Sequence, residues 1–248
     1  MDYESERRAE KMSICIDVKN LTKRYGTRTV VNHLSFEVKE GEVYGILGHN
    51  GAGKSTTIET ILGLKKADEG EVLILGKNPG KSRKELFEYI GVQLQASHYQ
   101  HNIKVREICE EMSALYQKPQ NYHDLLEKFG LSKFENTFVE KLSGGEKQKL
   151  SVVLALLCGP KIVFLDELTT GLDAAARREV WNLLAELRKE GTTIVLTTHY
   201  MEEAEILCDR ICLIREGKKV IEGSVLEVIK ASPYEKLEDA YLWYMDEK

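Results

Sequence analysis

Residues 48–56 read GHNGAGKST, and this short stretch decides the fold of the chain. It matches the pattern G-x-x-x-x-G-K-[ST], with Gly48, Gly53, Lys54 and Ser55 at the fixed positions. The apolar run EVYGIL (42–47) precedes it and predicts a buried strand, while a helix is expected after it. Glycines let successive backbone N–H groups surround a phosphate without a Cβ in the way. The stretch therefore predicts a strand, a phosphate-binding P-loop and a helix, in that order.

The P-loop pattern also assigns roles to its side chains. We expect Lys54 to reach the β- and γ-phosphates of a nucleotide and the Ser55 hydroxyl to ligate Mg²⁺. The alternative is a glycine-rich turn with an exposed lysine, which the strand before the loop and the helix after it make less favoured. The candidate nucleotide-binding residues are Gly48, His49, Asn50, Gly51, Ala52, Gly53, Lys54, Ser55 and Thr56.

Two further apolar runs end in polar residues. They are KIVFLDE (161–167) and TTIVLTTH (192–199), and unbroken apolar runs are typical of parallel strands covered on both faces. Ligands bind outside the carboxyl ends of the strands in such sheets. The P-loop, the carboxylate pair of Asp166 and Glu167, and His199 are therefore expected at the same edge of one sheet.

This convergence suggests how each group would act. Asp166 suits a direct or water-mediated contact to Mg²⁺, and Glu167 suits the orientation and polarisation of an attacking water. His199 is expected to sense a γ-phosphate, not to ligate a metal. The alternatives are an acidic pair in a solvated loop and a histidine with a structural role only.

A second candidate anion site lies in LSGGEKQKL (142–150). Leu150 and the apolar residues after it recur along one face and predict a helix. Ser143, Gly144 and Gly145 precede it and leave backbone N–H groups uncovered at the positive end of that helix. This segment therefore predicts a second place where a phosphate could bind.

Composition narrows the class of protein. The chain has 248 residues, of which 42% are hydrophobic, so it can bury a substantial core. A net charge of −5 argues against a sequence-independent nucleic-acid partner. The five cysteines include no CxxC pair, which favours packing residues in a reduced protein over a metal site. They are Cys15, Cys109, Cys158, Cys208 and Cys212.

The ends and apolar runs of the chain indicate no targeting or membrane-spanning segment. Residues 1–12, MDYESERRAEKM, are charged and are expected to form a disordered tail. The longest apolar run, VVLALLCG, is far shorter than the roughly 18 residues of a spanning helix. If the protein works at a membrane, we expect another chain to cross it.

The order of motifs resembles the nucleotide-binding domain of ABC transporters. The P-loop, LSGGE, VFLDE, GLD and TTH follow one another, and the likeness runs from about residue 14 to the end. It implies an α/β P-loop NTPase of RecA-like type, forming one ATP-binding domain over residues 13–248. Within it we expect short antiparallel strands before the P-loop, a strand pair at 69–80, a helical subdomain inserted over about 84–141, and a strand pair with a helix over about 217–248.

The resemblance implies further site residues and a dimer. In this family the LSGG signature of one subunit faces the P-loop of the other across ATP. It therefore implies contacts to ATP in trans from Ser143, Gly144, Gly145, Glu146 and Asp173, the last from a loop (171–173) that reports across the dimer. Tyr25 matches the aromatic that stacks on adenine, with a surface tyrosine as the alternative.

The resemblance also completes the expected metal and catalytic sets. Gln95 matches a glutamine that contacts Mg²⁺ and the attacking water, and Gln93 is the less favoured candidate. The metal ligands are then Ser55, Gln95 and Asp166, and the catalytic residues are Glu167, His199 and Gln95. ATP and Mg²⁺ are the cofactors that the resemblance implies.

Two residues depart from the family pattern. Glu146 stands where glutamine is usual, and Leu168 stands where proline usually follows the glutamate. A carboxylate in the first turn of a helix suits the dipole, but near phosphate it opposes ATP binding in trans. We expect both departures to tune the rate of turnover.

The resemblance favours an ATPase subunit whose separate transmembrane permease subunits carry out transport. TTHYMEEAEILCDRICLI and LEDAYL look most like subunits of ABC-2-type exporters. Such a subunit would be peripheral, at the cytoplasmic face of the cell membrane, and soluble when expressed alone. The alternatives are a soluble ABC ATPase, such as a cluster-assembly ATPase, and a regulatory ATP-binding module. Candidate permease contacts, which could equally fill the subdomain core, are Tyr99, Ile103, Tyr116 and Tyr122.

Overall fold

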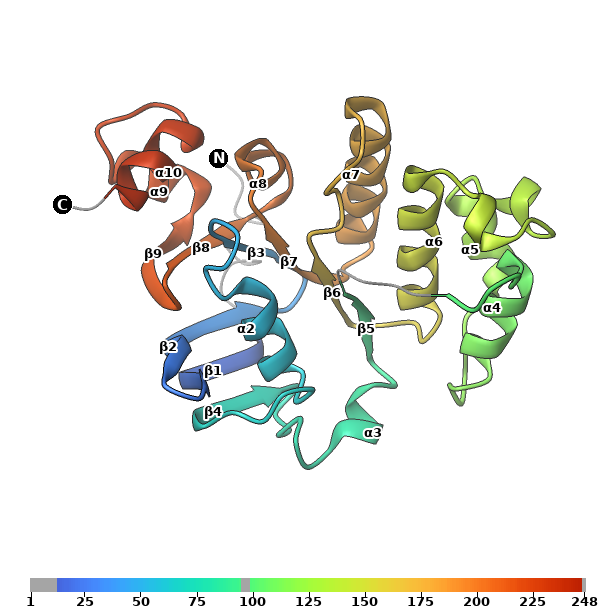
Figure 1. The fold of residues 1–248 in the computed structure, drawn as a ribbon, viewed down its shortest axis with the longest axis horizontal. Helices are drawn as coiled ribbons and strands as arrows, with labels where there is room; N and C mark the ends of the chain where they lie inside the picture. Colours follow the sequence, from blue (N-terminus) through green and yellow to red (C-terminus); the bar gives the residue numbers. More distant parts are fainter. Residues whose placement is uncertain (1–12, 95–98, 247–248) are drawn as a thin grey trace, which may run out of the picture.

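A computed structural model describes residues 13–94 and 99–246. Its centre is a six-stranded sheet in the order β5-β6-β7-β3-β8-β9, shown in Figure 1. The first five strands in this order are parallel, and β9 is antiparallel to β8. The strands are β3 (Val43–Leu47), β5 (Ile90–Gln93), β6 (Ile162–Asp166), β7 (Thr193–Thr198), β8 (Arg210–Arg215) and β9 (Lys218–Ser224).

The three strands expected from unbroken apolar runs are confirmed. Every residue of β3, β6 and β7 is buried, as required of strands covered on both faces. Their parallel pairing places the P-loop, residues 166–167 and His199 at the same edge of the sheet.

A three-stranded antiparallel sheet covers one face of the central sheet. Its order is β2-β1-β4, with β1 (Ile14–Tyr25), β2 (Arg28–Lys39) and β4 (Glu69–Ile74). β1 and β2 have 12 residues each and are longer than expected, because bulges such as the one between Val18 and Leu21 let the pairing continue. The segment at 69–80 forms one strand and not a pair, since the chain turns at Leu75 and Gly76 and makes only an isolated bridge.

Helices cover the other face and the flank of the central sheet. Figure 1 shows α4, α5 and α6 together at one end of the molecule and α9 and α10 at the other. The helices are α2 (Lys54–Ile61), α3 (Arg83–Leu86), α4 (Val105–Ser113), α5 (Tyr122–Lys128), α6 (Gly144–Leu156), α7 (Ala174–Lys189), α8 (Met201–Leu207), α9 (Val225–Lys230) and α10 (Leu237–Met245). Two 3-10 helices, η1 (Ser132–Phe134) and η2 (Val139–Lys141), connect α5 to α6.

Two expected boundaries differ from the observed elements. The region expected to be helical from about 84 includes β5, which lies at the edge of the central sheet, so the helices packed around α6 begin at α4. The strand pair expected from 217 is the hairpin of β8 and β9, and its first strand starts at Arg210.

The core has two parts, one on each face of the central sheet. Ile16, Ile46 and Phe164 belong to the part beneath the antiparallel sheet and α2. Leu150, Trp181 and Leu196 belong to the part beneath the helices α4 to α8. All five cysteines are free and buried, which agrees with their expected packing role. Within the part of the chain that the structure describes, no helix has both the length and the apolarity needed to cross a membrane.

Candidate ATP-binding site

The P-loop (residues 48–53) connects β3 to α2 and depends on its glycines. Gly53 has φ +104°, and a Cβ on it would lie 2.6 Å from the carbonyl oxygen of Val30. A Cβ on Gly48 would lie 2.6 Å from the carbonyl oxygen of Ile214. Neither position tolerates a side chain, so the backbone itself forms the concave surface of the loop.

Lys54 begins α2 and is held inside the loop. Its side chain is only 3% exposed, and its Nζ donates to the carbonyl oxygens of Gly48 at 2.9 Å and His49 at 3.3 Å. The same Nζ forms an ion pair with Oε1 of Glu167 at 2.9 Å. The predicted convergence of the P-loop and the acidic pair is therefore observed as a direct, buried contact.

Asp166 ends β6 beside this pair. The Thr197 hydroxyl donates a hydrogen bond to its Oδ1. Burial raises the pKa of Asp166, and hydrogen bonds from Thr197 and Ser55 oppose that rise. Ser55 on α2 and Asp166 on β6 thus bring two oxygen groups together from separate elements.

Glu167 leaves the strand through a sharp turn. Its φ is +50°, a left-handed conformation that non-glycine residues seldom adopt. Its backbone N–H donates to the carbonyl oxygen and to the hydroxyl of Thr197, at 3.2 and 3.0 Å, and these bonds hold the turn. The turn directs the carboxylate toward Lys54 and not along the strand. Such strained residues are found at functional sites.

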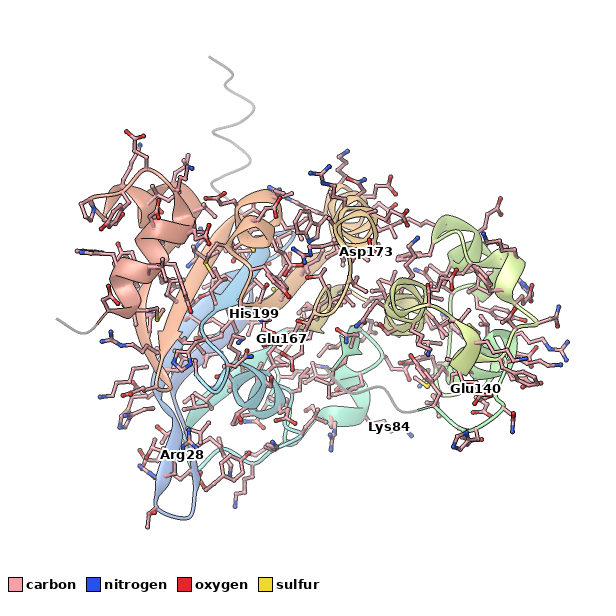
Figure 2. All side chains as sticks on the ribbon, turned by 45° about the horizontal axis from the view of Figure 1, so that its top comes forward. Arg28, Lys84, Glu140, Glu167, Asp173 and His199 are labelled. Carbon is pink, nitrogen blue, oxygen red and sulfur yellow. The ribbon has the colours of Figure 1, made fainter. Side chains whose placement is uncertain are left out.

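His199 lies on the other side of the same carboxylate. Its Nδ1 is 3.7 Å from Oε2 of Glu167, and Figure 2 shows the two residues next to each other at the sheet edge. The Thr170 hydroxyl lies 3.5 Å from the same oxygen. One carboxylate therefore contacts the P-loop lysine through one oxygen and faces the predicted γ-phosphate sensor through the other.

A cavity of about 470 Å³ opens above these groups. Tyr25, at the end of β1, lines it and is 45% exposed, with the Nζ atoms of Lys23 and Lys65 each 5.4 Å from its ring centroid. Arg28 also lines it, although the sequence did not single this residue out, because an arginine in a hairpin carries no motif. The lining residues are Tyr25, Arg28, Val30, Asn50, Gly51, Gly53, Lys54, Ser55, Thr56 and Glu167.

Of the two candidate glutamines, the structure describes only Gln93. Gln95 lies outside the described residues. Gln93 ends β5, is 4% exposed, and donates through Nε2 to the carbonyl oxygen of Leu94.

The signature residues 143–146 start α6, as expected. Ser143 is the N-cap; its Oγ accepts from the Glu146 N–H at 3.3 Å, while Oε2 of Glu146 accepts from the Ser143 N–H at 2.8 Å. Residues 143–146 lie outside the lining of the P-loop cavity in the described chain. Within one copy, the structure therefore does not bring the two predicted phosphate sites together.

Asp173 has a local role in this copy. It caps α7 by accepting from the N–H groups of Ala175 and Ala176, both at 2.9 Å. The unusual Leu168, which follows the turn at Glu167, is 3% exposed and packs in the core.

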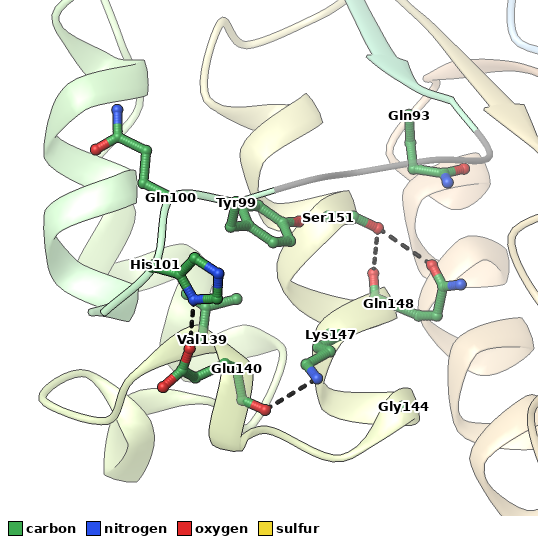
Figure 3. Close-up of a pocket in the computed structure, with 10 residues that line it drawn as sticks. All are labelled: Gln93, Tyr99, Gln100, His101, Val139, Glu140, Gly144, Lys147, Gln148 and Ser151. Atoms are coloured by element: carbon green, nitrogen blue, oxygen red, sulfur yellow. Dashed lines mark hydrogen bonds and ion pairs between the residues drawn. The ribbon is translucent and has the colours of Figure 1, made fainter. Parts of the chain in front are cut away.

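A second cavity, of about 370 Å³, lies beside α6 (Figure 3). Glu140 accepts from the Lys147 Nζ through its carbonyl oxygen at 3.1 Å, and its Oε2 lies 3.4 Å from Nδ1 of His101. Of the tyrosines and the isoleucine proposed for this region, Ile103 is 6% exposed in the core, while Tyr99, Tyr116 and Tyr122 pack against the core and are partly buried. Ile103 is therefore a packing residue.

Glu203 is a buried polar residue that the sequence did not single out. It is 3% exposed on α8 and accepts hydrogen bonds from Thr169 and Trp181. A carboxylate placed among the buried residues Met201, Ala204 and Leu207 on one short helix was the available signal.

Comparison with known proteins agrees with this geometry. The family model described as ABC transporter matches residues 31–170. The "Nod factor export ATP-binding protein I" of Burkholderia orbicola (strain AU 1054) is 41% identical over 221 residues, covering 87% of this chain and 73% of that protein.

Solved structures give the same result. The ATP-binding subunit of an ABC transporter has a TM-score of 0.85 at 25% identity, covering 94% of this chain and all of that one. A dimeric ATP-binding cassette in a post-hydrolysis state, bound to ADP and phosphate, has a TM-score of 0.75 at 26% identity, covering 84% of this chain and 98% of that one. The chain belongs to the ABC transporter family, as one of its ATP-binding proteins, and it is an ATPase that couples ATP hydrolysis to transport.

Proposed function

We propose that this ATPase energises export through separate membrane-spanning permease subunits, and that it does so as a homodimer at the cytoplasmic face of the membrane. The observation that carries the catalytic part is the buried contact between Lys54 and Glu167, with His199 at 3.7 Å from the same carboxylate. The similar Nod factor export ATP-binding proteins support the outward direction.

ATP binding is proposed to begin by exchanging one partner of Lys54 for another. The ammonium group lies in the P-loop cavity with Glu167 as its counter-ion. Phosphate oxygens that enter the loop supply a competing negative charge and take over the ammonium group. Glu167 is then released toward His199 and acts as the base that orients and polarises the attacking water, while His199 contacts the γ-phosphate.

Ser55 and Asp166 fit a hard cation. Ser55 lies near enough to Asp166 to lower the pKa of that carboxyl, and Mg²⁺ is commonly held by one or two protein oxygens plus phosphates. Within the described residues, no group of three His, Cys, Asp or Glu is arranged to hold a metal on its own, which suits a cation that arrives with the nucleotide. Bound Mg²⁺ would neutralise charge on the phosphates. Gln95 is proposed as a further ligand from the sequence alone.

The signature segment is proposed to act on the ATP of a second copy. Residues 143–146 start a helix of 13 residues and lie outside the P-loop cavity of their own chain, so two copies arranged head to tail would complete two sites. Asp173 would lie at the same interface. The dimeric cassette among the similar structures supports this arrangement.

The polar cavity beside α6 is the proposed docking place of the permease. It adjoins the signature helix through Gly144, Lys147 and Gln148, so a segment seated there would contact the element proposed to bind ATP in trans (Figure 3). The helices packed around α6 would then form the inserted helical subdomain.

The catalytic assignment is tested with Glu167→Gln. We expect the turnover number for ATP to fall by at least about 100-fold, as for loss of a general base, while ATP binding persists and promotes a stable dimer. Steady-state ATPase assays and light scattering with and without ATP measure both. Glu227→Gln, the same change on the distant helix α9, is the control and should leave turnover unaltered. Unchanged turnover in Glu167→Gln would refute the assignment.

A further inference from the structure

The carboxylate of Glu203 is a buried junction between segments that are far apart in the sequence. Its Oε1 accepts from the Thr169 hydroxyl at 2.9 Å and from Nε1 of Trp181 at 2.9 Å. All three residues are nearly inaccessible, with 3%, 1% and 4% of their surfaces exposed. The two donors satisfy a carboxyl oxygen that is buried away from water, so this junction links three segments of the chain.

Each segment carries or adjoins a group of the ATP site. Thr169 is two residues after Glu167, and its carbonyl oxygen accepts from the Leu172 N–H at 3.2 Å, in the loop of residues 171–173. Trp181 lies on α7, the helix that directly follows this loop. Glu203 lies on α8, which starts two residues after His199. Glu167 and His199 are thus attached to the same buried oxygen through short stretches of chain.

A second contact crosses the same two helices nearer the site. The Arg177 guanidinium on α7 lies 4.4 Å from the ring centroid of Tyr200, and its Nη2 donates to the Leu172 carbonyl oxygen at 3.4 Å. The Tyr200 ring is in turn 4.2 Å from the His199 ring. α7 is therefore linked to α8 through Glu203 and to the N-cap residue of α8 through Tyr200. Figure 2 shows where His199, Glu167 and Asp173 lie.

The placement of Glu167 needs such support. Its positive φ and its 3.7 Å approach to His199 depend on where the following residues are anchored. Hydrogen bonds from Thr197 fix the residue from the side of β7. The Glu203 junction fixes the chain two residues later, from the side of α8.

We propose that Glu203 is a positioning residue for ATP hydrolysis, which sets the geometry of the Glu167 carboxylate relative to His199 through its bonds to Thr169 and Trp181. The proposal deepens the proposed function and rests on its assignment of Glu167 and His199. Glu203 makes no contact with nucleotide in this scheme. It acts on the rate of the chemical step and leaves nucleotide affinity to the P-loop.

The test compares variants that remove the acceptor with variants that remove one donor. Because small misplacements of catalytic groups cost large factors in rate, we expect Glu203→Ala to lower kcat for ATP at least about tenfold, with KM changed less than about twofold. Thr169→Val and Trp181→Phe each remove one donor and should lower kcat about threefold or more, again with little change in KM. Glu203→Gln keeps an oxygen that accepts from both donors and should retain most of the wild-type kcat.

Tyr44→Phe is the matched control. The Tyr44 hydroxyl also donates to a glutamate, Glu222, at 2.9 Å, but this contact joins β3 to β9 away from the nucleotide cavity. Tyr44→Phe should lower the free energy of unfolding about as much as the removal of one donor to Glu203, and it should leave kcat unchanged. All assays are made on variants that circular dichroism shows to be folded; should Glu203→Ala fail to fold, the two donor variants decide.

The outcomes separate this inference from the proposed function. If Glu167→Gln abolishes turnover while Thr169→Val and Trp181→Phe keep the wild-type kcat, the role of Glu203 is overturned and the catalytic assignment stands. If the donor variants raise KM and leave kcat unchanged, Glu203 is a structural residue only. If Glu167→Gln hydrolyses ATP at the wild-type rate, the assignment of Glu167 as the base is refuted, and the role of Glu203 that rests on it is refuted as well.

Discussion

The helices α2 and α6 both start at glycine-rich motifs, yet their first turns are built differently. The glycines of the P-loop precede α2, whereas the two glycines of the signature are the first residues of α6. The N-cap of α2 is Gly53, which has no side chain, and the first turn opens with the buried Lys54. The N-cap of α6 is Ser143, and its first turn contains Glu146, which closes a reciprocal capping box. The start of α2 therefore contains a buried cation paired with Glu167, whereas at the start of α6 the Ser143 and Glu146 side chains each accept from the other's backbone N–H.

Because of this difference, we expect the two proposed phosphate sites to bind an anion under different conditions. At α2 the uncapped N–H groups and Lys54 favour an anion, and Glu167 provides the only partner that the described structure shows for the lysine charge. At α6 the Ser143 N–H and Oγ already have partners, so a phosphate must compete with Glu146. We therefore expect α2 to bind nucleotide in a single copy and α6 to contribute only when a second copy closes.

The largest expected effect comes from removing the cation at α2. Lys54→Ala should weaken ATP binding by about 100-fold or more, because a charge-assisted contact to phosphate is lost in a buried loop. It also leaves Glu167 buried without its counter-ion, which costs about 3 kcal/mol in the free energy of unfolding. Titration with a fluorescent ATP analogue and urea denaturation measure the two effects. The same substitution in a Glu167→Gln background separates them, because the neutral glutamine restores stability and not binding. If Lys54→Ala binds ATP with the affinity of the wild type, the proposed difference between the helix starts of α2 and α6 is refuted.

A smaller and different effect is expected at α6. Ser143→Ala removes the N-cap, which costs about 1 kcal/mol of stability, and it should lower ATP turnover roughly tenfold or more by loss of the trans contact. ATP binding to the single copy should stay within about twofold of the wild type, since residues 143–146 lie outside the P-loop cavity.

The chain offers a matched control for this capping loss. Ser224 caps α9 in the same reciprocal box with Glu227, and Figure 1 shows α9 at the opposite end of the molecule from α6. Ser224→Ala should cost similar stability with no change in turnover. Equal turnover in Ser143→Ala and Ser224→Ala would argue that the α6 start serves the fold alone.

The sequence predicted the elements that rest on local pattern. Continuous apolar runs identified β3, β6 and β7, and the residues after them identified the groups that meet at the sheet edge. The apolar periodicity after Gly145 also predicted α6, but capping of this helix by the Ser143 side chain was not predicted.

Other features depend on contacts between distant residues and left no local pattern. The four residues of β5 lie in a helical-looking stretch and form a strand because β6 offers an edge to pair with. The direct bond between Lys54 and Glu167 depends on the turn at Glu167, whose positive φ no motif announces. The junction at Glu203 joins residues 34 and 22 positions away. Such contacts are set by packing, so only the folded chain reveals them.

The smallest expected effect comes from removing only the negative charge at the start of α6. Glu146→Gln keeps the shape of the capping side chain and removes the negative charge beside the proposed trans phosphate site. Because like charges at a partly exposed site repel modestly, we expect ATP turnover to rise about threefold at low salt, and the gain to shrink as ionic strength screens the repulsion. Glu227→Gln, in the equivalent capping box of α9, should lose the same small amount of helix stability without any gain in turnover. ATPase rates at two salt concentrations compare the pair. A fall in turnover specific to Glu146→Gln would mean that the carboxylate assists at the trans site instead of opposing the phosphate. Both helix starts would then carry a charged side chain that favours turnover, a cation at α2 and an anion at α6.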